Sequence, residues 1–108
     1  MINQRRILKV PGSAAIATTL APGESFQLVA VMCHLSAAGA AGNMTITLDA
    51  IAGAAYDAVI VSQDMTDVTS YVNVFEIPIQ FDAGDELDIA WANGSTRDYG
   101  LTIIYDLL

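Results

Sequence analysis

The alternation of apolar and polar residues constrains most strongly what this chain can fold into. In the segments 44–50 and 86–92 nearly every second residue is a large apolar one, with polar or small residues between. Glycine, proline, asparagine and aspartate interrupt the pattern at intervals of roughly ten residues, as turns do between short strands. A period of two is typical of half-buried β-strands, and helical spacing hardly occurs, so the pattern predicts an all-β chain.

We expect eight or so strands. They cover 7–10, 14–20, 24–35, 44–50, 56–62, 71–76, 77–81, 86–92 and 99–107. The strand over 24–35 is expected to be central because both of its faces are apolar. One face holds Phe26, Leu28, Ala30 and Met32, and the other holds Val29, Val31, Cys33 and Leu35. Pro78 places 77–81 at a sheet edge or a bulge, and Asn93-Gly94 is a hairpin turn signal.

This strand pattern predicts an antiparallel β-sandwich, in particular an eight-stranded jelly roll. An immunoglobulin-like sandwich is the alternative, weakened because the chain has one cysteine and that fold is often marked by a cysteine pair. At 108 residues, with turn signals spread evenly, the chain is expected to form one domain.

The charge of the chain is distributed unevenly. Arg5, Arg6 and Lys9 supply three of the four basic residues, so residues 1–10 carry +3 and residues 11–108 carry −11. We therefore expect a basic N-terminal arm with the first edge strand over 1–10, and a single jelly-roll-like domain over 11–108. The three basic residues are the candidate partner-binding residues, and a solvated first strand is the alternative. The acidic body argues against nucleic acid as a partner.

Apolar residues are more abundant than one small core requires. They make up 54% of the chain without counting glycine, whereas about 45–50% is usual with glycine included. Some must therefore lie on the surface, which predicts a subunit interface; a dense alanine-rich core is the alternative.

No apolar stretch approaches a membrane span. Without the disulfides of small secreted domains, an intracellular origin fits better, and polar residues interrupt any leader-like segment near the N-terminus.

Catalysis is not expected. Cys33 and His34 are neighbours, so on a strand they point to opposite faces and cannot form a dyad. One cysteine and one histidine also cannot supply the protein ligands of a zinc site, and no cofactor motif is present. The carboxylates of Asp82, Asp85, Glu86 and Asp88 could bind calcium as an alternative function. A turn and a solvated strand face account for these acidic residues more readily.

The segment 77–92, Ile-Pro-Ile-Gln-Phe-Asp-Ala-Gly-Asp-Glu-Leu-Asp-Ile-Ala-Trp-Ala, resembles the strand, Gly-Asp turn and strand step of many jelly rolls. With 44–48, the turn at 53–56 and the strand over 99–105, the chain resembles small jelly-roll structural proteins of tailed bacteriophages. The resemblance implies a homotrimer that binds the major capsid protein as a cement or decoration protein. It also implies synthesis in the host cytoplasm, a place on the capsid surface of the virion and no enzymatic activity, with 1–10 as the docking region.

Two other functions are compatible with a β-sandwich. A carbohydrate-binding module would use exposed aromatic residues, for which Tyr56, Tyr71, Trp91 and Tyr99 are the candidates. Trp91 shares a strand face with Leu87 and Ile89, however, and is expected in the core. A head or tail accessory domain of a phage is the other alternative, and it differs from a decoration protein only in its location.

Overall fold

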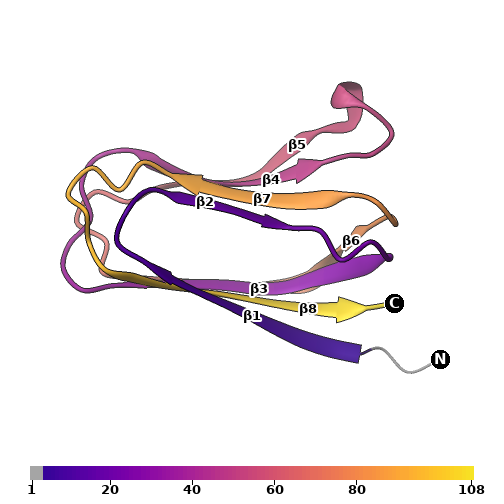
Figure 1. Ribbon diagram of the computed structural model, residues 1–108, viewed down its shortest axis with the longest axis horizontal. Helices are drawn as coiled ribbons and strands as arrows, with labels where there is room; N and C mark the ends of the chain where they lie inside the picture. Colours follow the sequence, from indigo (N-terminus) through magenta and orange to yellow (C-terminus); the bar gives the residue numbers. More distant parts are fainter. Residues whose placement is uncertain (1–3) are drawn as a thin grey trace.

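The computed structural model describes residues 4–108, which form eight β-strands and one short 3-10 turn (Figure 1). The strands are β1 (Gln4–Gly12), β2 (Ile16–Leu20), β3 (Phe26–Leu35), β4 (Asn43–Asp49), β5 (Ala58–Asp64), β6 (Ser70–Phe81), β7 (Glu86–Trp91) and β8 (Tyr99–Leu107). The 3-10 turn η1 (Ala54–Tyr56) precedes β5. Within residues 4–108, no helix is long and apolar enough to cross a membrane.

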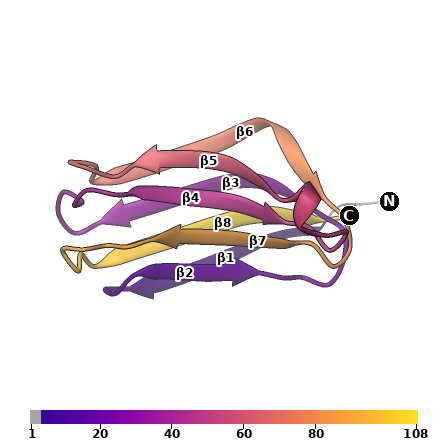
Figure 2. The same cartoon turned by 90° about the horizontal axis from the view of Figure 1, so that it is seen from above.

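The strands form two four-stranded antiparallel sheets. Sheet A has the order β1-β8-β3-β6, and sheet B has the order β2-β7-β4-β5. Figure 1 shows the two layers, and in Figure 2 the strands of sheet B lie over those of sheet A. The first strand pairs with the eighth, the second with the seventh, the third with the sixth and the fourth with the fifth. In a jelly roll a long antiparallel hairpin, with strands one to four paired to strands eight to five, folds over so that successive strand pairs alternate between two sheets. The observed order has this pattern and confirms the predicted antiparallel jelly-roll sandwich.

The core lies between the facing sheets. Phe26 and Phe81 stack where β3 begins and β6 ends, with ring centroids 4.5 Å apart, and Tyr105 meets Phe26 edge-on. The alternation predicts the inward residues of the regular strands correctly: Met44 and Ile46 of β4, and Leu87, Ile89 and Trp91 of β7, are all buried. Each buried large apolar side chain contributes roughly 1.5–3 kcal/mol relative to its exposed state.

A bulge changes the inward face of β3. The pairing of β3 with both of its neighbours shifts between Leu28 and Ala30, so the alternation changes phase at Val29. The inward residues are Phe26, Leu28, Val31, Cys33 and Leu35. The two faces predicted for β3 are therefore correct only up to Leu28. The prediction that β3 is central is confirmed, since it lies between β8 and β6.

The second half of sheet A also differs from expectation. The predicted strands 71–76 and 77–81 are one strand, β6, whose register on β3 shifts between Val74 and Ile79. Pro78 lies in this irregular stretch of an edge strand, where no ladder hydrogen bond is lost. The segment at Asn93-Gly94 is not a hairpin turn, because β7 belongs to sheet B and β8 to sheet A.

The expected N-terminal arm is part of the sandwich. β1 begins at Gln4, runs through Pro11 to Gly12 and pairs with β8 along its whole length, so no boundary falls at residue 10. Met1, Ile2 and Asn3 lie outside the described residues. An edge strand explains the basic composition, because long cationic side chains stay hydrated there and discourage pairing with other chains.

Candidate assembly surface

The outer face of sheet A carries a row of apolar residues across all four strands. The register places Ile7 of β1 opposite Ile104 of β8, Ile104 opposite Ala30 of β3, and Ala30 opposite Val74 of β6. In the adjacent row Met32 of β3 lies opposite Val72 of β6. We call these six residues the outer patch: Ile7, Ala30, Met32, Val72, Val74 and Ile104.

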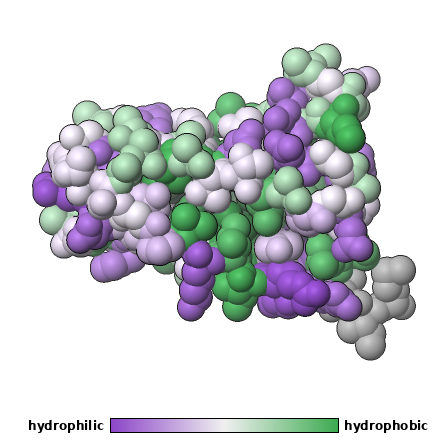
Figure 3. Space-filling model, viewed as in Figure 1, coloured by the Kyte–Doolittle hydropathy of each residue, from purple (hydrophilic) through white to green (hydrophobic). Residues whose placement is uncertain are grey.

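The members of the outer patch at the two sheet edges are the most exposed. The exposed fraction is 58% for Ile7, 61% for Val72 and 65% for Val74. Ala30, in the middle of the row, is only 3% exposed although it is not part of the core between the sheets. Figure 3 shows apolar side chains reaching the lower margin of the molecule over β1 and β8, between hydrophilic groups. The patch therefore consists of adjoining apolar positions on one face and not of residues scattered singly over the surface.

The outer face of sheet B has the opposite character. Its first register row holds Thr19, Asp88, Thr47 and the exposed Val59, and the next holds Ala17, Ala90, Thr45 and Ser62. Asp49 pairs with Glu86 at the end of this face. Such a polar face is usual for an antiparallel sheet that water covers. The sandwich thus has a mostly polar outer face on sheet B and an apolar patch on the outer face of sheet A.

The basic residues of β1 do not form one cluster. Arg5 and Lys9 share the outer face of sheet A with Ile7, because side chains two apart on a strand point the same way. Arg6 points to the other side, where its Nη2 donates to Oε1 of Gln4 at 3.0 Å. The predicted set of Arg5, Arg6 and Lys9 is therefore divided between the two faces of the strand.

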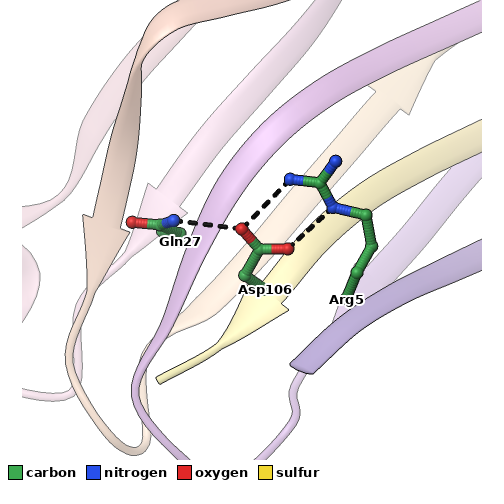
Figure 4. Close-up of polar contacts among 3 residues, drawn as sticks. All are labelled: Arg5, Gln27 and Asp106. Carbon is green, nitrogen blue, oxygen red and sulfur yellow. Dashed lines mark hydrogen bonds and ion pairs between the residues drawn. The ribbon is translucent and has the colours of Figure 1, made fainter. Parts of the chain in front are cut away.

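Arg5 is used within the chain. Its Nε and Nη2 donate to the two carboxylate oxygens of Asp106 at 2.9 and 3.2 Å, and Nε2 of Gln27 donates to the same carboxylate at 3.0 Å (Figure 4). The Asp106 side chain is 8% exposed and that of Arg5 is 59% exposed. The hydrogen bond from Arg5 lowers the pKa of Asp106 most, and the bond from Gln27 lowers it further. The hydrogen bond to Asp106 raises the pKa of Arg5. Lys9 makes no ion pair within residues 4–108.

The residues with catalytic potential lie as expected. Cys33 faces the core and His34 the solvent, and burial raises the pKa of the Cys33 thiol. A thiol that is buried and protonated in this way is not a nucleophile at neutral pH.

The acidic segment after β6 is mainly a turn. Both carboxylate oxygens of Asp85 accept backbone N–H groups, from Ile51 at 3.0 Å and Asp82 at 2.9 Å. Asp49, Glu86 and Asp88 gather on the outer face of sheet B, with carboxylate oxygens within 4.8 Å of one another. Asp49 is distant in sequence from the other two, and only its polar position on 44–50 could have suggested that it joins them.

The aromatic residues do not form a sugar-binding platform in the described part of the chain. Trp91 is 3% exposed, Tyr71 and Tyr99 are half-buried, and Tyr56 is 67% exposed in η1. The expectation that Trp91 is a core residue is confirmed. A carbohydrate-binding platform needs exposed aromatic rings side by side, and here one ring stands by itself.

The chain is therefore a jelly-roll sandwich with an apolar patch on one outer face. No sequence profile of a protein family and no curated protein matches it. Among solved structures, a similar chain comes from the work titled "Bacillus endospore appendages form a novel family of disulfide-linked pili". That chain is 10% identical, with 99% of this chain and 90% of that chain covered and a TM-score of 0.44. A likeness of this degree says nothing about what the present chain does.

Proposed function

We propose that this protein is a structural subunit that assembles with other proteins through the outer face of sheet A. The observation that carries the proposal is the outer patch, a group of adjoining apolar residues across four strands on a sandwich whose other outer face is mostly polar. In the setting implied by the resemblance to phage jelly-roll proteins, it is a decoration or cement protein on the head of a virion. A head or tail accessory domain would use the same surface.

The size of the outer face suits a protein partner. Four strands spaced about 4.8 Å apart place the outermost members of a row about 15 Å from each other. A specific interface buries about 800 Å² on each partner and has an apolar centre with a polar rim. Ile104 and Met32, which are partly exposed, form such a centre, and Lys9, Gln27 and the Arg5–Asp106 pair form a rim.

The charges of this face favour an acidic partner. Arg5 neutralises Asp106, and Lys9 adds a cation without an ion pair within residues 4–108, whereas the whole chain has a net charge of −8. A like-charged shell or subunit would be repelled elsewhere on the molecule but not here. Self-association and attachment to a major capsid protein are both compatible with this surface. The resemblance, and not the geometry, implies a trimer.

Light scattering and co-purification test the proposal. We expect the protein to be oligomeric at tens of micromolar, or to co-purify from its source with a larger protein particle. The variant Ile7→Gln removes an exposed apolar contact at the edge of the patch and should weaken that association by about tenfold. Val59→Gln is the matched control, because Val59 is 60% exposed on β5 of the other sheet. A protein that stays monomeric and attaches to no particle would refute the proposal.

A further inference from the structure

The four edge strands of the sandwich differ in how they are protected from pairing with another chain. β1 carries Arg5, Arg6 and Lys9 together with Pro11, and cations and proline are common protections of an exposed edge. β2 is only five residues long. β5 has a register shift opposite Ile46 and Thr47 and ends at Asp64. Each of these three edges has a feature that discourages strand addition.

The first half of β6 has none of these features. Residues 70–75 read Ser-Tyr-Val-Asn-Val-Phe, without a charge, a proline or a glycine, and their pairing with β3 is regular from Ser70 to Val74. β6 is the last strand of sheet A, and the described residues place no strand beyond it (Figure 2). A regularly paired, uncharged edge that is rich in β-branched and aromatic residues is a template for another strand.

The sequence of this edge is close to a palindrome about Asn73. In an antiparallel pair of two β6 strands centred on Asn73, Val72 of one copy lies opposite Val74 of the other, and Tyr71 opposite Phe75. Ser70 then meets Glu76, so no two like charges are opposed. Cross-strand aromatic and β-branched pairs are the side-chain contacts that stabilise sheets.

We propose that the partner of this edge is a second copy of the chain, joined by antiparallel pairing of β6 with β6 about a two-fold axis at Asn73. A surface used by both partners of a two-fold dimer must complement itself, and the palindrome provides that property. The pairing also opposes no two like charges, which matters because two copies of net charge −8 repel each other elsewhere.

This dimer rests on the proposed structural role and makes it more specific. Two copies of sheet A become one continuous eight-stranded sheet, and Val74 of one outer patch comes next to Val72 of the other. The outer patches then form a single apolar surface on the dimer. The building block has two copies, in contrast to the trimer that the phage resemblance implies.

A charge swap at Asn73 tests the pairing. Asn73→Asp places two carboxylates opposite each other on the axis and should raise the dissociation constant of the dimer by about tenfold or more. Asn73→Lys should do the same with two ammonium groups. An equimolar mixture of the two variants should recover the dimer, because opposite charges then meet. The measurement is sedimentation equilibrium of the full chain, with circular dichroism to show that each variant is folded.

Gln4→Glu is the matched control, since it adds one negative charge to β1 at the opposite edge of sheet A and should leave the dimer unchanged. A folded wild-type protein that is a monomer or a trimer would overturn the β6 pairing. So would a dimer that neither Asn73 variant weakens. If Ile7→Gln still weakens association in those cases, the proposed structural role survives and only the two-fold pairing fails.

Discussion

Arg5 and Asp106 are 101 positions apart in the sequence, yet the guanidinium of Arg5 donates to both carboxylate oxygens of Asp106. The pair connects β1 to β8 on the outer face of sheet A, next to Ile7 and Ile104. It removes a free carboxylate from the face that we propose for assembly. The same pair also fixes the edge strand, whose hydrogen-bonded neighbour is β8.

Replacing Asp106 by Asn should lower the thermal unfolding midpoint by a few degrees. The amide keeps one acceptor oxygen but loses the charge that favours the bidentate geometry with Arg5. That single oxygen cannot accept all the hydrogen bonds that Arg5 and Gln27 donate to the carboxylate. Differential scanning calorimetry measures the change. Asp98→Asn is the control, because Asp98 is exposed and its side chain makes no hydrogen bond within residues 4–108. Equal midpoints for the two variants would contradict a stabilising role of the pair.

The stability difference between wild type and Asp106→Asn should depend on pH. The pKa of Asp106 is lowered in the folded protein, so the unfolded state binds a proton first as the pH falls. The stabilisation is therefore complete above the ordinary aspartate pKa of about 3.9 and is lost as the pH falls through the lower, folded value. Asp64 also has a lowered pKa, but it is present in both proteins and cancels. Urea unfolding between neutral pH and the acid limit of folding measures the difference. A stability difference that grows as the pH falls would contradict the lowered pKa of Asp106.

Gly39→Ala should destabilise the fold by about 1–3 kcal/mol, because the added methyl group has no space. A Cβ at Gly39 would collide with the backbone oxygen of Met65, and Gly39 cannot move away since Val68 and Asp67 hold its backbone. Gly94→Ala is the matched control, with no atom within 4 Å of the added Cβ. Chemical denaturation compares the two, and similar losses for both would show that the loop yields easily.

Lys9→Ala should slow association with an acidic partner and reduce its salt dependence, because rim charges act mainly on the rate of encounter. Arg6→Ala should have a much smaller effect, since Arg6 points to the other face of β1 and contacts Gln4. The measurement is binding kinetics at low and high salt, using the larger particle with which the protein co-purifies. A larger effect for Arg6→Ala than for Lys9→Ala would contradict binding of the partner to the outer face of sheet A.

The alternation of apolar and polar residues correctly predicts the features of this fold that are decided by residues close together in the sequence. It identified the inward residues of β4 and β7 and the central place of β3. It failed where one extra residue changes the phase, at Val29, because a bulge has no signature in hydrophobicity alone.

Turn chemistry was an incomplete guide in the same way. Asn93 does have the positive φ, 49°, that its turn signal indicates. Its side chain, however, bonds the backbone of Ala14 and Arg97 and so connects the loop between β1 and β2 to the loop between β7 and β8. Local sequence specifies a turn, whereas the partners of the flanking strands are decided by the whole sandwich.

The outer patch was predicted only as surplus apolar surface. Its members come from β1, β3, β6 and β8, and only the register shows that they form adjoining rows. One local signal was available, because Ile104 lies between Thr102 and Asp106 on the otherwise polar face of its strand.

The order of the strands has a consequence for synthesis of the protein. Because β1 is synthesised before β8 and pairs with no other strand of the described chain, it has no partner until β8 emerges from the ribosome. During that interval both of its edges are open to other nascent chains. We therefore expect Arg5, Arg6, Lys9 and Pro11 to protect the unfinished polypeptide from aggregation as well as the finished one.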